Sequence, residues 1–78
     1  RFPKNEYPYV ATKPWHGSQK KVDKDERSVT IELDVVINYE LEQKILSWGD
    51  YVEVLQPQTL RDTIGHRLEN AIRNNRLK

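Results

Sequence analysis

The sequence predicts an α+β fold, a small sandwich with an antiparallel sheet and a long C-terminal helix. Residues 28–38 alternate apolar and polar side chains, which is typical of a strand with one buried face. Residues 58–75 place an apolar side chain at every fourth position, which is typical of an amphipathic helix. These positions are Leu60, Ile64, Leu68 and Ile72.

The first two predicted elements are short. Residues 1–3 predict the tail of a strand, ended by a proline that cannot donate to a ladder. Residues 6–13 predict a helix, because Pro8 suits a first turn and Pro14 prevents the helix from continuing.

A hairpin is predicted next. Residues 15–17 form a loop, and residues 18–22 form a brief strand. The charged cluster 23–27 is too polar to bury and lies where the connection to the strand 28–38 is needed.

A second helix is predicted after Asn38, whose side chain can cap it. Leu41, Ile45 and Trp48 form one apolar stripe along this helix. Gly49 supplies a left-handed C-cap. Because Trp48 completes the stripe just before this cap, we expect its ring to be a buried anchor.

Residues 51–55 predict a last strand, and Gly65 interrupts the terminal helix. A glycine inside a helix costs about 1 kcal/mol relative to alanine, so a close packing contact or tolerated strain is expected there. The order strand, helix, strand, strand, helix, strand, helix is that of a ferredoxin-like split βαβ sandwich with an added terminal helix.

Composition limits the function classes. The chain has 78 residues, 36% hydrophobic and 32% charged, with a net charge of +1 and no cysteine. We expect no metal site, no cofactor and a cytoplasmic location, because there is no zinc-ligand spacing, signal peptide or apolar run of about 20 residues. The sequence lacks methionine. We therefore expect one domain, residues 1–78, from a larger protein, with its first strand largely truncated.

The charge is segregated along the chain. The net charge is +4 over residues 1–21, −6 over residues 22–56 and +3 over residues 57–78. We interpret the acidic middle and the basic ends as attracting each other within or between chains. A phosphate-binding face is the alternative interpretation.

No catalytic set is predicted. The glycines stand alone, so phosphate and dinucleotide loops are absent, and no acid is spaced to orient His16 toward Ser18 as a triad requires. The carboxylates Glu32 and Asp34 fit the solvated face of a strand. The arginines of the terminal helix spread around its axis, so they predict no DNA-reading stripe.

A loop offers the best ligand candidates, since ligand-facing residues tend to collect in loops. The tentative ligand-binding residues are Trp15, His16, Ser18 and Gln19, in and beside this loop, together with Arg61 of the terminal helix.

Several stretches together resemble the C-terminal extension (WCX) domain of WYL-domain transcriptional regulators of bacteria. They are residues 9–20 with Lys-Pro-Trp-His-Gly-Ser-Gln, residues 39–49 ending in Trp-Gly, and residues 52–57 with Val-Glu-Val-Leu-Gln-Pro, followed by Leu60-Arg61. Two residues depart from the expected pattern: Trp15 replaces a smaller aliphatic residue, and Gly65 replaces a charged helix former.

The resemblance implies a regulatory, dimerisation and effector-gating module rather than an enzyme. It implies as partners the WYL domain of the same protein, a second copy in a homodimer, DNA through a missing N-terminal helix-turn-helix domain, and an unknown effector such as a nucleotide or nucleic acid. The alternative function is a stand-alone small-molecule or nucleotide sensor that uses the five loop and helix residues named above. A truncated first strand would leave a gap in the sheet, which favours self-association.

Overall fold

The computed structural model describes residues 1–76 and separates into two compact units. The first unit comprises Arg1–Val36 and Asp50–Glu53. The second comprises Ile37–Gly49 and the chain from Val54 onward. Each unit is described by itself below.

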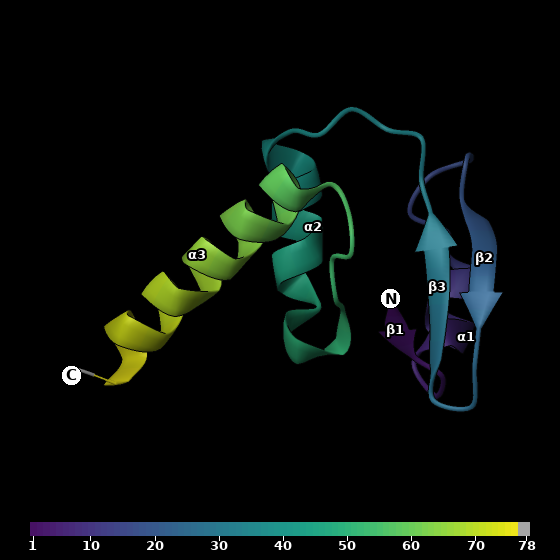
Figure 1. Ribbon diagram of the computed structural model, residues 1–78, viewed down its shortest axis with the longest axis horizontal. Helices are drawn as coiled ribbons and strands as arrows, with labels where there is room; N and C mark the ends of the chain where they lie inside the picture. The colour runs from purple at the N-terminus through teal and green to yellow at the C-terminus, as the bar shows by residue number, and fades with distance from the viewer. Residues whose placement is uncertain (77–78) are drawn as a thin grey trace. The chain divides into compact units, whose positions relative to one another are not determined.

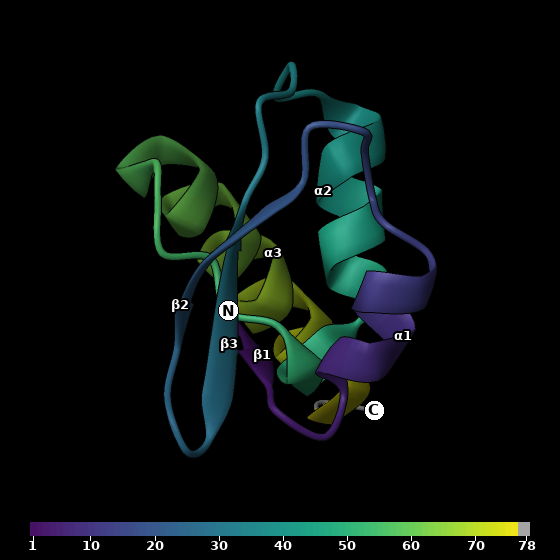
Figure 2. The ribbon, with the colours of Figure 1, turned by 90° about the vertical axis from the view of Figure 1, so that its right-hand side faces the viewer.

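The first unit holds a three-stranded antiparallel sheet in the order β1-β3-β2 (Figure 1). Its strands are β1 Phe2–Pro3, β2 Lys20–Lys24 and β3 Ser28–Glu32. The helix α1, Tyr7–Thr12, connects β1 to the hairpin. Figure 2 shows the β2–β3 hairpin as a twisted pair with β1 alongside β3.

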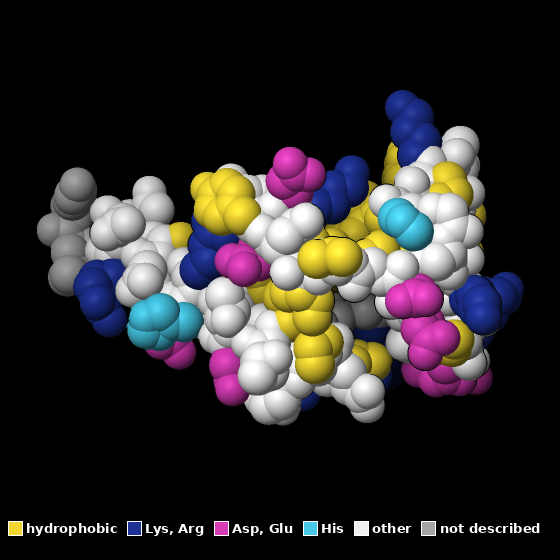
Figure 3. Space-filling model, turned by 90° about the horizontal axis from the view of Figure 1, so that it is seen from above, with side chains coloured by type: hydrophobic (Ala, Val, Ile, Leu, Met, Phe, Trp, Pro, Cys, Tyr) yellow, Lys and Arg dark blue, Asp and Glu magenta, His cyan; other side chains and the backbone are white. Residues whose placement is uncertain are grey.

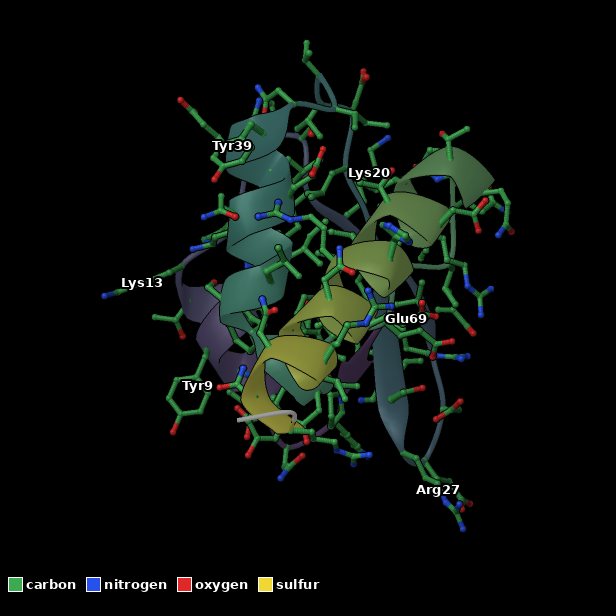
Figure 4. The ribbon with its side chains drawn as sticks, turned by 90° about the vertical axis from the view of Figure 1, so that its left-hand side faces the viewer. Tyr9, Lys13, Lys20, Arg27, Tyr39 and Glu69 are labelled. Atoms are coloured by element: carbon green, nitrogen blue, oxygen red, sulfur yellow. The ribbon has the colours of Figure 1, made fainter. Side chains whose placement is uncertain are left out.

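The core of this unit is small and centred on β1 and β3. Phe2 lies opposite Val29 in the ladder, and both side chains are buried. Val10 of α1 is fully buried as well. Tyr9 and Lys13 point away from α1 into solvent (Figure 4), so α1 has one buried side and one exposed side.

The hairpin connection is organised by Asp25, which lies between the two long strands. Its Oδ1 accepts hydrogen bonds from the backbone N–H groups of Arg27 and Ser28, both at 2.7 Å. This short side chain satisfies the turn's donors, as aspartate commonly does in turns. Arg27 projects from the hairpin tip in Figure 4.

The long strand predicted over residues 28–38 is too long, because β3 ends at Glu32. Its partner β2 begins at Lys20, two residues later than predicted, and the chain before it forms a turn. Beyond Glu32 the backbone N–H of Asp34 therefore bonds a side chain in place of a strand backbone. It donates to Ser18 Oγ at 2.9 Å. Side-chain exposure still alternates over residues 31–36, as the pattern predicts.

The strand predicted over residues 51–55 is wrong. Gly49–Tyr51 form a 3₁₀ turn, and no strand follows it before α3. One reciprocal pair of backbone hydrogen bonds joins Glu53 to Arg1, at 2.8 and 2.7 Å.

The second unit is a pair of contacting helices, α2 Tyr39–Ser47 and α3 Gln58–Arg76 (Figure 1). Asn38 caps α2 as predicted, because its Oδ1 accepts from Leu41 N–H at 2.9 Å. Gly49 has the predicted left-handed conformation, with φ of 58°. The buried side chains of this unit are Ile45, Leu60 and Ile64.

For these helices the expected burial of Trp48 is wrong, and one of the two alternatives for Gly65, the close packing contact, is excluded among the described residues. Trp48 is only half-buried, because it is the cap residue at which the chain leaves α2; Ile45, one turn earlier, is the buried member of the stripe. Gly65 has no close packing contact, since a Cβ built there meets nothing within 4 Å among the described residues.

Arg67 clamps α3 to α2. Its guanidinium donates to Glu42 Oε1 at 3.2 Å and to Gln43 Oε1 at 2.6 Å. It also lies over the ring of Tyr39, with its central carbon 5.3 Å from the ring centroid. Figure 4 places Tyr39 at the start of α2. Arginine suits this role because its planar group serves carboxylate, amide and ring together.

The α+β class, the antiparallel sheet and the long C-terminal helix are confirmed. The strands of the sheet lie in the order β1-β3-β2, with antiparallel neighbours. The complete ferredoxin-like sandwich stays a prediction, because its fourth strand is not formed.

Candidate functional site

The turn from Trp15 to Gln19 connects α1 to β2 and holds four of the five candidate residues. Gln19 links the two elements. Its Oε1 accepts from Trp15 N–H at 3.0 Å, and its Nε2 donates to the carbonyl of Val10 at 3.3 Å. Because Val10 is buried in α1, this amide fixes the start of the turn on the core.

His16 and Ser18 form the middle of the turn. Ser18 N–H donates to His16 Nδ1 at 3.0 Å, and Ser18 Oγ lies 2.8 Å from the same nitrogen. Since Nδ1 accepts a backbone N–H, the neutral ring carries its proton on Nε2. The ring is exposed. A ligand would therefore meet Nε2 as a hydrogen-bond donor.

Ser18 also connects the turn to the chain beyond β3. Its Oγ accepts from Asp34 N–H at 2.9 Å and lies 3.3 Å from the Asp34 carbonyl oxygen. The side chain thus replaces a strand residue at this position. It uses hydrogen-bonding capacity that a ligand would otherwise engage.

Trp15 packs on the core rather than standing in solvent. Its ring meets that of Phe2 edge-to-face, with centroids 5.5 Å apart and planes at 81°. Such pairs contribute about 0.5–1.5 kcal/mol beyond the area that they bury. Trp15 is half-buried, so only part of its surface is open to a ligand.

The Ser18–His16 contact differs from a nucleophile–base pair. In a catalytic triad one ring nitrogen faces the serine, and a carboxylate binds the other. Here Nδ1 takes both the hydroxyl and the backbone N–H of Ser18, two residues away. The geometry is that of a side chain stabilising a turn.

Arg61, the fifth candidate, lies exposed on α3 in the second unit. The structure brings Trp15, His16, Ser18 and Gln19 together in one turn. Their role as ligand-binding residues stays a prediction.

Two charged positions outside the turn have shifted pKa values. The backbone N–H groups of Arg27 and Ser28 lower the pKa of Asp25. The hydrogen bond and charge of Glu53, whose Oε1 lies 2.6 Å from an Arg1 nitrogen, raise the pKa of Arg1. Asp25 belongs to the charged cluster 23–27 predicted as the hairpin connection, and its spacing from Ser28 is a signal for the individual turn-stabilising role that the structure shows.

Among residues 1–76, no group of three or more histidine, aspartate or glutamate side chains could hold a metal ion. None of the helices in this range is long and apolar enough to cross a membrane.

Comparison with known proteins identifies the family. A family model for the WCX domain matches residues 1–72, from β1 through most of α3. The chain belongs to the WCX domain family. No curated protein and no solved structure matches it. Within this WCX domain, the Lys-Pro-Trp-His-Gly-Ser-Gln stretch is the turn that joins α1 to β2.

Proposed function

We propose that this WCX domain is a non-catalytic regulatory module of a larger cytoplasmic transcriptional regulator. In this role it packs against the WYL domain of the same protein, supports homodimerisation and helps to gate the response to an effector. DNA is contacted by a separate helix-turn-helix domain.

The observation that carries this proposal is the WCX family match over residues 1–72. The turn supports it, since Ser18 and Gln19 hold the fold together through contacts with Asp34 and Val10. The arrangement is suited to a structural role of the turn, not to acid–base or nucleophilic chemistry.

The test uses the intact regulator and a version without the WCX domain. Operator binding is followed by fluorescence anisotropy, and oligomeric state by light scattering, with and without inducing conditions. We expect the shortened protein to lose stable dimers and the change in operator affinity on induction. Unchanged dimerisation and unchanged induction would contradict the proposal.

A stand-alone sensor is the second candidate, favoured by the exposed ring of His16 beside Trp15. The probes are a panel of nucleotides, followed by thermal shift and Trp fluorescence. If a nucleotide stabilises the chain, Trp15→Phe combined with His16→Ala should abolish that stabilisation. A panel without any shift, or a shift that survives both substitutions, would rule this site out.

A further inference from the structure

His16 accepts a hydrogen bond that only its neutral ring can accept. Its Nδ1 takes the backbone N–H of Ser18 at 3.0 Å, and the Ser18 hydroxyl oxygen lies 2.8 Å from the same nitrogen. A neutral imidazole has one accepting nitrogen, whereas both nitrogens of the imidazolium ion are donors. Protonation of Nδ1 must therefore change both contacts with Ser18.

The hydroxyl of Ser18 can accept the new donor, because it is already bonded to Asp34. Its Oγ accepts from Asp34 N–H at 2.9 Å and lies 3.3 Å from the Asp34 carbonyl oxygen. A hydroxyl has one proton and two lone pairs. Beside a neutral ring this proton has two acceptors, and Nδ1 is nearer than the Asp34 carbonyl. Beside a protonated ring, Nδ1–H donates to Oγ, and of the two acceptors only the carbonyl remains.

The two forms of the ring therefore favour two sets of bonds. With a neutral ring, Ser18 N–H is bonded to Nδ1, and Asp34 is joined to Ser18 through its N–H alone. With a protonated ring, Ser18 N–H loses its acceptor and bonds water, while Asp34 is joined to Ser18 through both its N–H and its carbonyl. Two bonds to one residue resemble the pairing of an antiparallel ladder. Protonation thus exchanges a bond inside the turn for a second bond to the chain beyond β3.

The ring of His16 is open to proton exchange with solvent. Both histidine side chains are exposed, and they are cyan in Figure 3. Charged residues lie on each segment of the first unit that meets the turn: Lys13 at the end of α1, Lys20 in β2, Glu32 in β3, and Asp34. Within residues 1–76 none of them forms an ion pair with His16. Ser18 is therefore the group that responds to the charge of the ring.

We infer that the turn is a pH-sensitive switch, in which protonation of His16 turns the Ser18 hydroxyl toward the Asp34 carbonyl. The link between the turn and the chain beyond β3 then tightens. Histidine ordinarily changes its charge between about pH 5 and 8, so the switch operates near physiological pH. It lies wholly within the first unit and does not depend on the regulatory role proposed above. Failure of either one leaves the other to its own test.

The experiment is an NMR titration of the 78-residue chain from about pH 5 to 8, a range above the ordinary titration of carboxyl groups near pH 4. We expect the Asp34 carbonyl ¹³C signal and the Ser18 amide signals to titrate with the same midpoint as the His16 ring. After correction for the intrinsic pH dependence, amide exchange of Ser18 should quicken and that of Asp34 should slow as the ring is protonated. Each change should be about two- to tenfold, as expected for one hydrogen bond.

Three variants separate the parts of the switch. His16→Asn keeps an acceptor for the backbone N–H two residues on but cannot titrate, so the Asp34 response should disappear. Ser18→Ala keeps the titrating ring and removes the hydroxyl, so the ring should titrate without a response at Asp34. His66→Asn is the matched control, because it removes the histidine of α3 and should leave the Asp34 response unchanged.

The inference is wrong if the wild-type Asp34 carbonyl does not titrate with the midpoint of His16. It is also wrong if the Asp34 response survives in His16→Asn or in Ser18→Ala, or is lost in His66→Asn. The first of these tests uses the wild-type chain alone, so its outcome does not depend on how well a variant folds.

Discussion

Ser18 is the residue through which the turn and the chain beyond β3 are joined. Its hydroxyl bonds the backbone N–H of Asp34, while its own backbone N–H is held by His16. Its position beside the predicted loop 15–17 made this residue a ligand candidate. Its contacts explain the residue type by structure alone, because a small hydroxyl can serve as donor and acceptor in a tight turn.

Ser18→Ala is predicted to destabilise the chain by about 1 kcal/mol or slightly more, the usual value of one intramolecular hydrogen bond. Urea unfolding measures the effect. Ser47→Ala is the matched control, because within the described residues the Ser47 hydroxyl donates to the nearby carbonyl of Lys44 at the end of α2. If both serines cost the same, Ser18 does not anchor the chain beyond β3.

The tautomer of His16 gives a second prediction. Because Nδ1 accepts the Ser18 N–H, long-range ¹H–¹⁵N spectra of the neutral ring should place the proton on Nε2. In Ser18→Pro, which removes the N–H donor, this preference should weaken. A ring protonated on Nδ1 in the wild-type chain would contradict the turn geometry.

Asp25 predicts a dependence of stability on acid pH. Its folded pKa is lowered by the backbone N–H groups of Arg27 and Ser28. Stability from the charged form is therefore fully present above the unfolded aspartate value of about 3.9, and it is lost as pH falls through the lower folded pKa. The stability difference between wild type and Asp25→Ala should shrink over this window in urea melts. A carbonyl ¹³C titration of Asp25 with a midpoint at or above the ordinary value would contradict it.

At the scale of elements, local sequence patterns predicted the helices correctly. The strands were predicted less well, because their lengths depend on pairing with segments distant in the sequence. The helix predicted over residues 58–75 is α3, Gln58–Arg76, because its apolar period and the preceding proline are local signals. The end of β3 was not predictable in this way. The end of β3 depends on where its partner β2 begins, since Lys20 pairs with Glu32. The start of β2 is set by the hydrogen bonds of the Trp15–Gln19 turn, which the alternation of apolar and polar residues does not predict.

The strand predicted over residues 51–55 failed for the same reason. Its apolar alternation is suited to a strand, but a strand needs a neighbouring strand, and the sequence pattern does not show that the described backbone bonds of this stretch reach β1 through Glu53 and Arg1. Of the four clustered candidate residues, Trp15 and His16 were predicted in a loop and Ser18 and Gln19 at the start of a strand. The contacts of Ser18 with Asp34 and of Gln19 with Val10 could not be predicted from sequence spacing. Arg61 could not be related to them from the sequence, because it lies on another element.

Two glycines predict opposite effects of one substitution. Gly65→Ala should raise stability by about 1 kcal/mol, because the added Cβ meets nothing within 4 Å and alanine favours a helix. Gly49→Ala should lower stability by about 1 kcal/mol, because φ of 58° is strained for a residue with a Cβ. Thermal melts of the pair check both signs. Loss of stability in Gly65→Ala would show that something packs against that position.

At the scale of the whole molecule, opposite charges in successive blocks leave a net charge of only +1. The isolated chain should bind duplex DNA weakly, without sequence preference and with strong salt dependence, because its arginines form no stripe along α3. Anisotropy titrations with specific and scrambled duplexes measure this. Sequence-specific binding that survives physiological salt would show that the domain itself reads DNA.

The register shift in β2 has a consequence for solubility. β2 is an edge strand of the sheet, and its ladder with β3 is irregular between Lys21 and Asp23. All its residues are exposed, and Lys20, Lys21 and Lys24 place positive charges along the edge. A bulge and lysines on an edge are features that prevent strands of neighbouring molecules from adding to it. A straight, uncharged edge strand can pair with strands of other molecules and form aggregates. The β2 edge is irregular and charged, so it can stay exposed to solvent without starting fibril formation.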